Sequence, residues 1–236
     1  MHAAGRRVLR SVDVLAWVLI ERSNTPDGGA LELWRRGGEF SIRTAGRELM
    51  GSTMHGSEEQ LSLLALAALG KLERPRVLIG GLGFGYTLAA ALKRLGPKAR
   101  VVVDEISRAV IEWNRGVLGE LTGYPSNDPR VTVRTVDVID DLMHAEEPFD
   151  VILLDVDNGP SALSQARNAW LYREPGLDRV RAALNAGGVL GVWSAGPDPR
   201  FVRRLRSQRF RVEEHSVRAS GARGKRHTIW IAKRGS

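Results

Sequence analysis

Acidic side chains follow three separate apolar runs of the chain. Glu105 comes after residues 101–104, Asp137 after residues 131–136, and Asp155 after residues 151–154. Apolar runs rich in β-branched residues are typical of buried parallel strands, whose carboxyl ends meet at one edge of a sheet. A carboxylate at this edge can accept hydrogen bonds from a diol or an amine, or take a proton from a nucleophile. We therefore expect the three acids to share one ligand site.

A glycine-rich loop comes before these acids. The apolar run at residues 76–80 breaks into Gly81, Gly83 and Gly85 and resumes as an Ala/Leu stretch at residues 87–92. Glycines let the backbone turn tightly and approach a ligand where a Cβ would collide with it. Dinucleotide enzymes, methyltransferases and simple packing turns share this pattern, so the loop predicts a small-molecule cradle and leaves its ligand open.

Glu105 and Asp137 each have an expected ligand role, and for each the sequence leaves an alternative open. Glu105 lies 24 positions after Gly81, close to the spacing of about 20 residues at which an acid after the second strand binds ribose hydroxyls. Asp104 is the alternative for that role. Asp137 can accept a hydrogen bond from an exocyclic amine such as that of adenine, or cap a helix predicted at residues 138–143. The two roles of Asp137 are compatible.

The segment that follows the fourth strand of this region contains two further candidates. Asp155 ends the most apolar run, and Asp157 lies two positions later in a loop that contains Gly159 and Pro160. Acids at such an edge can hold or deprotonate a cationic nucleophile. A role in the turn alone is the alternative for Asp157.

The order of the predicted elements indicates an α/β fold. Strands at residues 76–80, 100–105, 130–136, 149–154 and 189–193 alternate with helices, and strands at 210–215 and 228–232 follow. This order implies a mostly parallel sheet with helices on both faces. A small antiparallel β-meander is predicted at residues 18–50, so the domains are expected at 1–55 and 56–236.

The helix after the meander is predicted at residues 57–72, with Ser57 and Gln60 as a capping box. The meander is too small to be stable alone and must pack on the main domain or pair with another chain. We therefore expect a homodimer through the N-terminal β segment.

The composition excludes several classes of site. The chain has 236 residues, no cysteine and a net charge of +8, and its histidines are scattered, at His2, His55, His144, His215 and His227. Disulfides, thiolate sites and a zinc site are not expected. Arginines at residues 200–211 indicate a solvated helix face, with a phosphate-binding patch as the alternative. Nucleic acid is therefore not expected as a partner. The apolar run at residues 14–20 is too short to span a bilayer, and a cytoplasmic protein is expected.

The motifs together resemble the spermidine-synthase family. The resemblance rests on residues 79–85, 103–107, 128–131 with Asp137, and 149–155, and it extends over residues 30–195. It implies the seven-stranded methyltransferase-type (Rossmann-like) sheet and an S-adenosyl sulfonium donor, with no metal. The donor-binding residues that it implies are Gly81, Gly83, Phe84, Gly85, Glu105, Ile106, Asp137, Val138 and Asp155. The implied catalytic residues are Asp155, Asp157 and Tyr172.

Two departures from the family pattern affect the expected reaction. Phe84 stands where the family usually has an aspartate, and Ser57-Glu58 replaces a Tyr-Gln pair. Because an aspartate in the loop would favour a donor without a carboxylate, Phe84 favours S-adenosylmethionine and methyl transfer to a small-molecule acceptor. The alternatives are a polyamine aminopropyltransferase that uses decarboxylated S-adenosylmethionine, and a protein that binds an adenosyl ligand without turnover.

Overall fold

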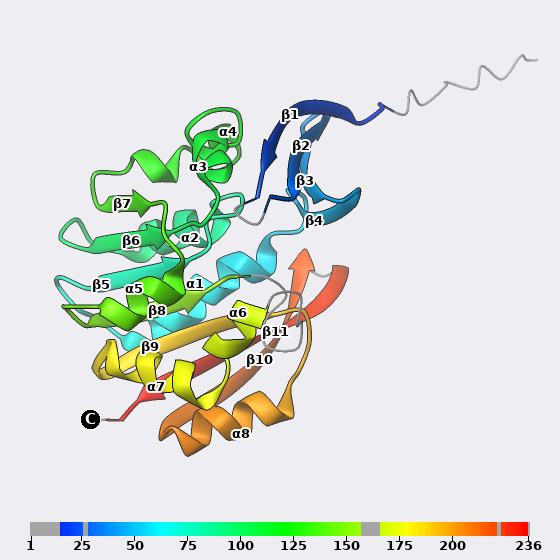
Figure 1. The fold of residues 1–236 in the computed structure, drawn as a ribbon. Coiled ribbons are helices and arrows are strands. Elements are labelled where there is room, and N and C mark those ends of the chain that lie inside the picture. Colours follow the sequence, from blue (N-terminus) through cyan, green and yellow to red (C-terminus); the bar gives the residue numbers. More distant parts are fainter. Residues whose placement is uncertain (1–14, 26–27, 157–165, 221–222, 236) are drawn as a thin grey trace, which may run out of the picture.

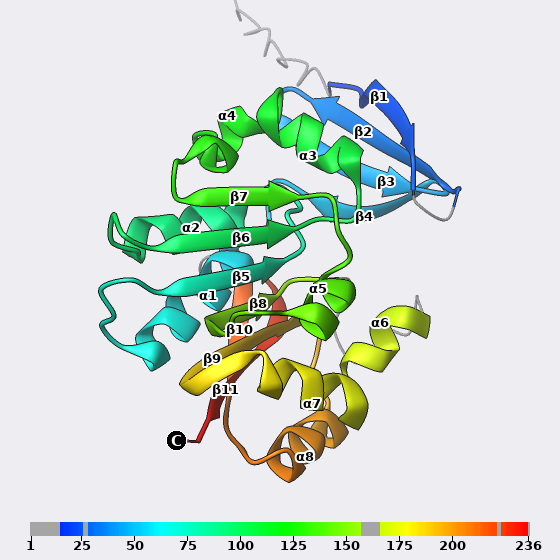
Figure 2. The same ribbon diagram turned by 60° about the vertical axis from the view of Figure 1, so that its left-hand side comes forward.

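The larger sheet of the molecule has seven strands. The computed structural model describes residues 15–25, 28–156, 166–220 and 223–235. The strands lie in the order β10-β11-β9-β8-β5-β6-β7 (Figure 2). They are β5 (Arg76–Gly80), β6 (Arg100–Asp104), β7 (Val131–Arg134), β8 (Phe149–Leu154), β9 (Leu184–Ser194), β10 (Phe210–Ser220) and β11 (Arg223–Arg234). Strands β5 to β9 are parallel, and β11 pairs antiparallel with both β9 and β10. The predicted α/β fold is confirmed.

Helices cover both faces of this sheet (Figure 1). One face carries α1 (Gly56–Leu69), α2 (Tyr86–Arg94) and α3 (Arg108–Arg115), and the other carries α5 (Val138–His144), α7 (Glu174–Ala182) and α8 (Pro199–Ser207). The alternation of side chains along β5 explains both contacts. Val77 and Ile79 pack in the core with α1 and α2, while Leu78 packs in the core with α5 and α7. The short helices are α4 (Gly119–Thr122), the 3-10 helix η1 (Pro125–Asn127) and α6 (Ala166–Leu171).

The N-terminal sheet has four antiparallel strands in sequential order. They are β1 (Val18–Asn24), β2 (Ala30–Arg36), β3 (Glu39–Thr44) and β4 (Arg47–Gly51). Leu31, Leu33, Phe40 and Ile42 are buried and belong to the same core as α1 and α2. The small sheet therefore packs beyond the carboxyl ends of the parallel strands (Figures 1 and 2). A domain boundary at residue 55 stays a prediction.

Several element boundaries differ from those expected. The capping box at Ser57 is wrong, because α1 begins at Gly56 with His55 at the N-cap, and no side chain caps it. Ser57 already lies in the first turn, and an N-cap residue needs non-helical dihedral angles. Strand β9 begins at Leu184, five residues earlier than expected, and β10 continues to Ser220.

The outer surfaces of the helices are polar. On α8, Phe201 and Leu205 are buried, whereas Arg200, Arg203 and Arg206 are exposed. This pattern is that of a solvated helix face. Among the described residues, no helix combines the length and the apolar character needed to cross a membrane.

Candidate functional site

A pocket of about 270 Å³ lies at the carboxyl ends of β5, β6 and β8. In an α/β sheet this edge is the usual place for a ligand, and here the chain crosses from one side of β5 to the other. The N-terminal sheet forms part of the wall through Leu31, Ile42, Leu49 and Met50. The predicted site residues that line the pocket are Gly81, Gly83, Glu105, Ile106, Asp137, Val138 and Asp155.

The glycine loop passes very close to the end of β8. Gly81 has a φ of +90°, and a Cβ at this position would lie 2.5 Å from the carbonyl oxygen of Asp155. No other residue fits this conformation and this space. The loop is also held from α3, because Asn114 Nδ2 donates to the carbonyl oxygen of Gly83 at 2.8 Å. Glycine at position 81 is therefore required by the backbone itself.

Glu105 is buried and ties the glycine loop to the end of β6. Its Oε2 accepts a hydrogen bond from the Leu82 amide at 2.9 Å, and its Oε1 accepts one from the Ser107 amide at 2.8 Å. Burial raises the pKa of this carboxyl above its ordinary value, and the backbone donors oppose that shift. Each carboxylate oxygen has two acceptor positions, so Glu105 can still accept hydrogen bonds from a ligand diol.

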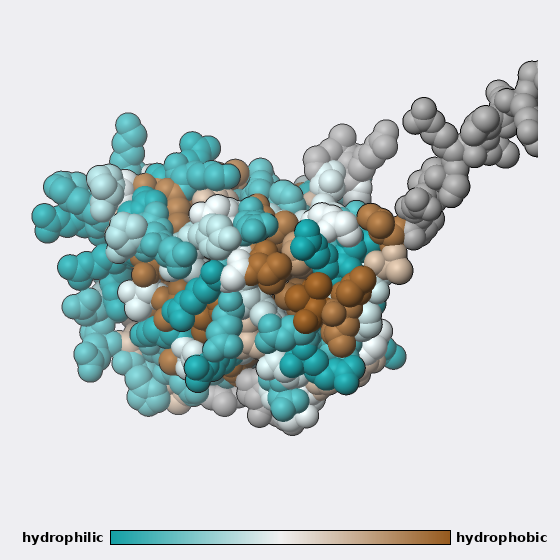
Figure 3. Space-filling view, turned by 90° about the horizontal axis from the view of Figure 1, so that it is seen from above, coloured by the Kyte–Doolittle hydropathy of each residue, from teal (hydrophilic) through white to brown (hydrophobic). Residues whose placement is uncertain are grey.

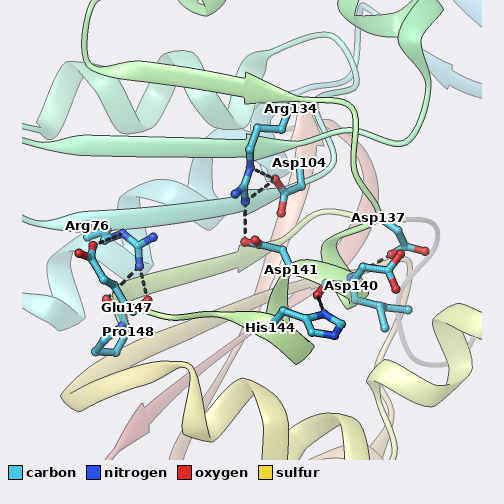
Figure 4. Close-up of polar contacts among 10 residues, drawn as sticks. Arg76, Asp104, Arg134, Asp137, Asp140, Asp141, His144, Glu147 and Pro148 are labelled. Carbon is cyan, nitrogen blue, oxygen red and sulfur yellow. Dashed lines mark hydrogen bonds and ion pairs between the residues drawn. The ribbon is translucent and has the colours of Figure 1, made fainter.

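Asp104, the alternative to Glu105, is committed to an ion pair. Arg134 lies between two carboxylates (Figure 4), 2.8 Å from Asp104 Oδ1 and 2.5 Å from Asp141 Oδ2. Burial and the neighbouring Asp141 raise the pKa of Asp104 to about 7. Because Arg134 holds Asp104, Glu105 is the better placed of the two acids to bind a diol.

Asp137 lines the pocket and also caps α5. Its Oδ1 accepts a hydrogen bond from the Ile139 amide at 2.9 Å (Figure 4). The capping role predicted for this residue is therefore confirmed, and its ligand role stays a prediction. Val138 follows directly and packs against Gly80, where an added Cβ would lie 2.9 Å from its Cγ2.

Asp155 lies beside a second carboxyl group. Its Oδ2 accepts a hydrogen bond from Thr87 Oγ1 at 2.6 Å. Burial raises the pKa of Asp155 to about 6, while burial and the charge of Asp155 raise the pKa of Glu58 to about 7. Two carboxyl groups with raised pKa values can accept and release protons near neutral pH. This end of the pocket is therefore suited to acid–base chemistry.

Four of the residues expected in the site do not line the pocket, or cannot be placed in it. Phe84 is buried in the core near Tyr86, where burial of the phenyl ring among apolar side chains is favourable. Gly85 is the N-cap of α2. Tyr172 is also buried, packs edge-on against Phe201 and donates its hydroxyl to the Val156 carbonyl at 3.4 Å. Asp157 lies outside the described residues.

The site also contains residues that the sequence did not predict. Thr87 and the pocket-lining residues of the N-terminal sheet were missed. Glu58 was expected to add negative charge near Asp155, but no acid–base role was predicted for it. Nothing in the order of residues signals that Met50 touches the glycine loop, where a Cβ on Gly83 would lie 3.4 Å from its sulfur. In the described part of the chain, no group of three His, Asp or Glu side chains is arranged to hold a metal ion.

The comparisons with known proteins agree with this geometry. Residues 55–197 match the family model of the spermine/spermidine synthase domain. The chain is 34% identical over 123 residues, 51% of its length, to a polyamine aminopropyltransferase of Pyrobaculum calidifontis, and 29% identical over 150 residues, 62% of its length, to that of Korarchaeum cryptofilum. The matched regions span only 41% and 44% of those relatives.

The fold has a similar solved structure, a spermidine synthase from Thermotoga maritima. That likeness has a TM-score of 0.70 at 19% identity and covers 92% of this chain and 73% of the other. At 19% identity, this likeness shows the fold alone. Both of the relatives named above are polyamine aminopropyltransferases, which is the alternative reaction of the sequence analysis and differs from the methyl transfer that Phe84 suggested.

Proposed function

Because the chain belongs to the spermine/spermidine synthase family, we propose that it transfers an aminopropyl group from decarboxylated S-adenosylmethionine to a small-molecule amine, a step of polyamine biosynthesis. One observation carries the proposal. One pocket joins the glycine loop and Glu105, which suit an adenosyl group, to Asp155, whose charge raises the pKa of Glu58. Aminopropyl transfer is preferred to methyl transfer because both curated relatives are aminopropyltransferases.

The donor side of the pocket would hold the adenosine. Glu105 would accept the ribose hydroxyls, and Asp137 would accept the adenine amine. Ile106 and Val138 supply apolar wall on either side of these acids. The sulfonium is already a good electrophile, so most of the rate would come from aligning donor and acceptor in a pocket that excludes water.

The acceptor side would hold an amine and take its proton. The amine nitrogen forms a bond to the carbon next to sulfur, the carbon–sulfur bond breaks, and its electron pair stays on sulfur as a neutral thioether. An ammonium ion cannot attack, so it must first lose a proton, and Asp155 is placed to accept it. The carboxyls of Asp155 and Glu58 also give this end a local negative charge that attracts a cationic amine, despite the net charge of +8.

Ligand titration and turnover test this proposal. Calorimetry with decarboxylated S-adenosylmethionine, S-adenosylmethionine and NAD should show the decarboxylated donor binding about tenfold more tightly than S-adenosylmethionine, because the acids near Asp155 repel the extra carboxylate. Incubation with a diamine such as putrescine should release methylthioadenosine together with a longer polyamine, measured by mass spectrometry.

The Glu105→Gln variant is the control for this titration. It should weaken both adenosyl donors by a similar factor of at least about 10, since the glutamine amide nitrogen can accept a hydrogen bond neither from the diol nor from the Leu82 or Ser107 amide that it faces. A wild-type preference for S-adenosylmethionine would overturn aminopropyl transfer in favour of methyl transfer. Binding of NAD alone would overturn the adenosyl-donor proposal altogether.

We further propose that the chain forms a homodimer through its N-terminal sheet. Strand β1 is an edge strand, and Val18 and Ile20 on it are 58% and 44% exposed. Figure 3 shows apolar side chains gathered on this side of the molecule, over the N-terminal sheet. An edge strand with exposed apolar residues is a typical surface for pairing with another chain.

Sedimentation velocity measures this association. We expect a dimer for the wild type, and an increase of at least about 100-fold in the dimer dissociation constant for Ile20→Lys, because the lysine would bring an unpaired charge into the interface. Leu72→Lys is the matched control, since Leu72 is 50% exposed and lies outside the N-terminal sheet. A monomeric wild type, or equal effects of the two substitutions, would contradict the proposed interface.

A further inference from the structure

Three side chains form a hydrogen-bonded chain that leads away from Asp155. Ser57 Oγ lies 2.6 Å from Glu58 Oε2 and 2.9 Å from His227 Nδ1. Thr87 lies between Glu58 and Asp155, since its hydroxyl donates to Asp155 Oδ2 at 2.6 Å and lies 3.4 Å from the carbonyl oxygen of Glu58. The charge of Asp155 also raises the pKa of Glu58. These hydrogen bonds therefore connect Glu58, the neighbour of Asp155, to His227 of the last strand, which lies 170 positions from Ser57.

The packing of α1 on the β10–β11 pair brings these residues together. Gly56 lies so close to the end of β10 that a Cβ on it would be 3.2 Å from the carbonyl oxygen of Ala219. Ser57 is fully buried at this contact, and His227 lies next to Thr228, which pairs with Ser194 of β9. Ser57 therefore serves as a connection between two elements, which explains why it does not cap the helix.

Ser57 has a single proton, and this fixes the direction of both hydrogen bonds. When Glu58 is ionised, Ser57 donates to Glu58, and His227 must donate to Ser57 from Nδ1. When Glu58 is protonated, Glu58 donates to Ser57, Ser57 donates to Nδ1, and His227 keeps its proton on Nε2. Passing from the second arrangement to the first moves one proton from Glu58 to the histidine.

We propose that Ser57 and His227 form a relay that carries to solvent the proton lost by the acceptor amine. This inference rests on the proposed aminopropyl transfer, which releases one proton in each turnover. The ammonium gives its proton to Asp155, and Asp155 gives it to the ionised carboxylate of the neighbouring Glu58. Glu58 then passes a proton to Ser57 as Ser57 passes its own to Nδ1, and the resulting imidazolium releases a proton to water. Before the next turnover the neutral ring takes a proton from water on Nε2 and loses the one on Nδ1, so that Nδ1 can accept again. Ser57 and His227 are positioning residues in this scheme, since neither touches the amine.

The surroundings of His227 suit a residue that holds a proton only briefly. The ring is half-buried, and its centroid lies 4.7 Å from that of Trp193 of β9 in an edge-to-face arrangement. Val217 on β10 is its cross-strand partner. Burial and the charge of Lys225 on β11 lower the pKa of His227, while Glu58 on α1 reaches it through Ser57. An imidazolium formed here loses its proton readily.

Kinetics of three variants test the relay. His227→Gln keeps a group that can bond to Ser57 but cannot take up a proton, and it should lower kcat about 10- to 100-fold with little change in donor affinity. Ser57→Ala should cause a similar loss, and the double variant should lose no more than either single one. Imidazole added to His227→Ala should restore part of kcat. His215→Gln, the same substitution on the neighbouring strand, should behave as the wild type.

The outcomes separate the relay from a structural role. A structural hydrogen bond would be preserved by glutamine, so wild-type kcat and an unchanged pH profile in His227→Gln would overturn the relay. The relay would also be overturned if kcat fell in His227→Gln but added imidazole did not restore any of the kcat of His227→Ala. If the wild type makes no methylthioadenosine with any amine, the proposed function fails, and the relay fails with it as a step of turnover.

Nuclear magnetic resonance tests the hydrogen-bonded chain without any activity. In ¹⁵N-histidine spectra at high pH, neutral His227 should carry its proton on Nδ1, whereas a histidine free in water prefers Nε2. Glu58→Gln should shift the titration of His227 and leave that of His215 unchanged. An Nε2-protonated His227, or a titration insensitive to Glu58, would overturn the inference whether or not the chain is an aminopropyltransferase.

Discussion

Replacing Asp155 by asparagine is expected to lower kcat by about 10²- to 10⁴-fold, because the acceptor amine then has no carboxylate to take its proton. Asparagine has nearly the same shape and can still accept the hydrogen bond from Thr87, so donor affinity should stay within about twofold. In the wild type, kcat should fall as the pH decreases through 7 and 6, the pKa values of Glu58 and Asp155. Steady-state rates between pH 5 and 9 and calorimetry with methylthioadenosine measure both effects.

The same variant should be more stable than the wild type at pH 8. Folding raises the pKa of Asp155 from 3.8 to about 6, so the ionised carboxylate costs stability above pH 6, and this cost disappears as the pH falls below 4. Asparagine lacks the charge and should gain about 1 to 3 kcal/mol at pH 8 and nothing at pH 4. Asp178→Asn, at an exposed position of α7, is the control and should change neither rate nor stability. Full activity of Asp155→Asn would rule out its acid–base role.

Gly81→Ala is expected to weaken donor binding by more than about 100-fold and to lower kcat as well. A Cβ at this position would lie 2.5 Å from the Asp155 carbonyl oxygen, so either the glycine loop or the end of β8 must move. Both carry residues of the pocket, and a shift of about 1 Å is enough to misalign donor and acceptor. Calorimetry for the donor and steady-state rates for turnover report the two losses.

Gly187→Ala separates the steric clash from the cost of the backbone conformation. Gly187 has a φ of +76°, similar to the +90° of Gly81, but nothing lies within 4 Å of a Cβ placed on it. Alanine there should cost about 1 kcal/mol of stability and leave donor binding unchanged. If the two variants bind the donor equally well, the close approach of the glycine loop to β8 has no functional importance.

The fold was largely predictable because local patterns specify it. The run of β-branched residues at Val101 and Val103 and the Ala/Leu stretch after Gly85 each allow one structure, and their order along the chain implies the parallel sheet. The strand-end acids were found for the same reason, since parallel strands must bring Glu105, Asp137 and Asp155 to one edge.

The remaining features of the site depend on contacts between distant segments. The Ser57 pattern fitted a capping box, yet the tertiary contact with His227 determines its role. Phe84 lies in the glycine loop, where a ligand contact was expected, but its side chain is buried in the core. Whether Asp104 or Glu105 is free for a ligand depends on Arg134, which comes from the next strand. Sequence spacing gives no information on such pairings.

The wall that Leu31, Ile42 and Met50 give to the pocket links ligand binding to the assembly of the molecule. The apolar side chains of this sheet are buried in the same core as α1 and α2, so the complete pocket exists only while the sheet is docked. Any ligand that needs the complete pocket therefore stabilises the docked state by an amount that grows with the logarithm of its concentration. If the ligand is the proposed donor, its free concentration sets how stable the docked N-terminal sheet is, and with it how much of the edge strand β1 is presented in its folded form.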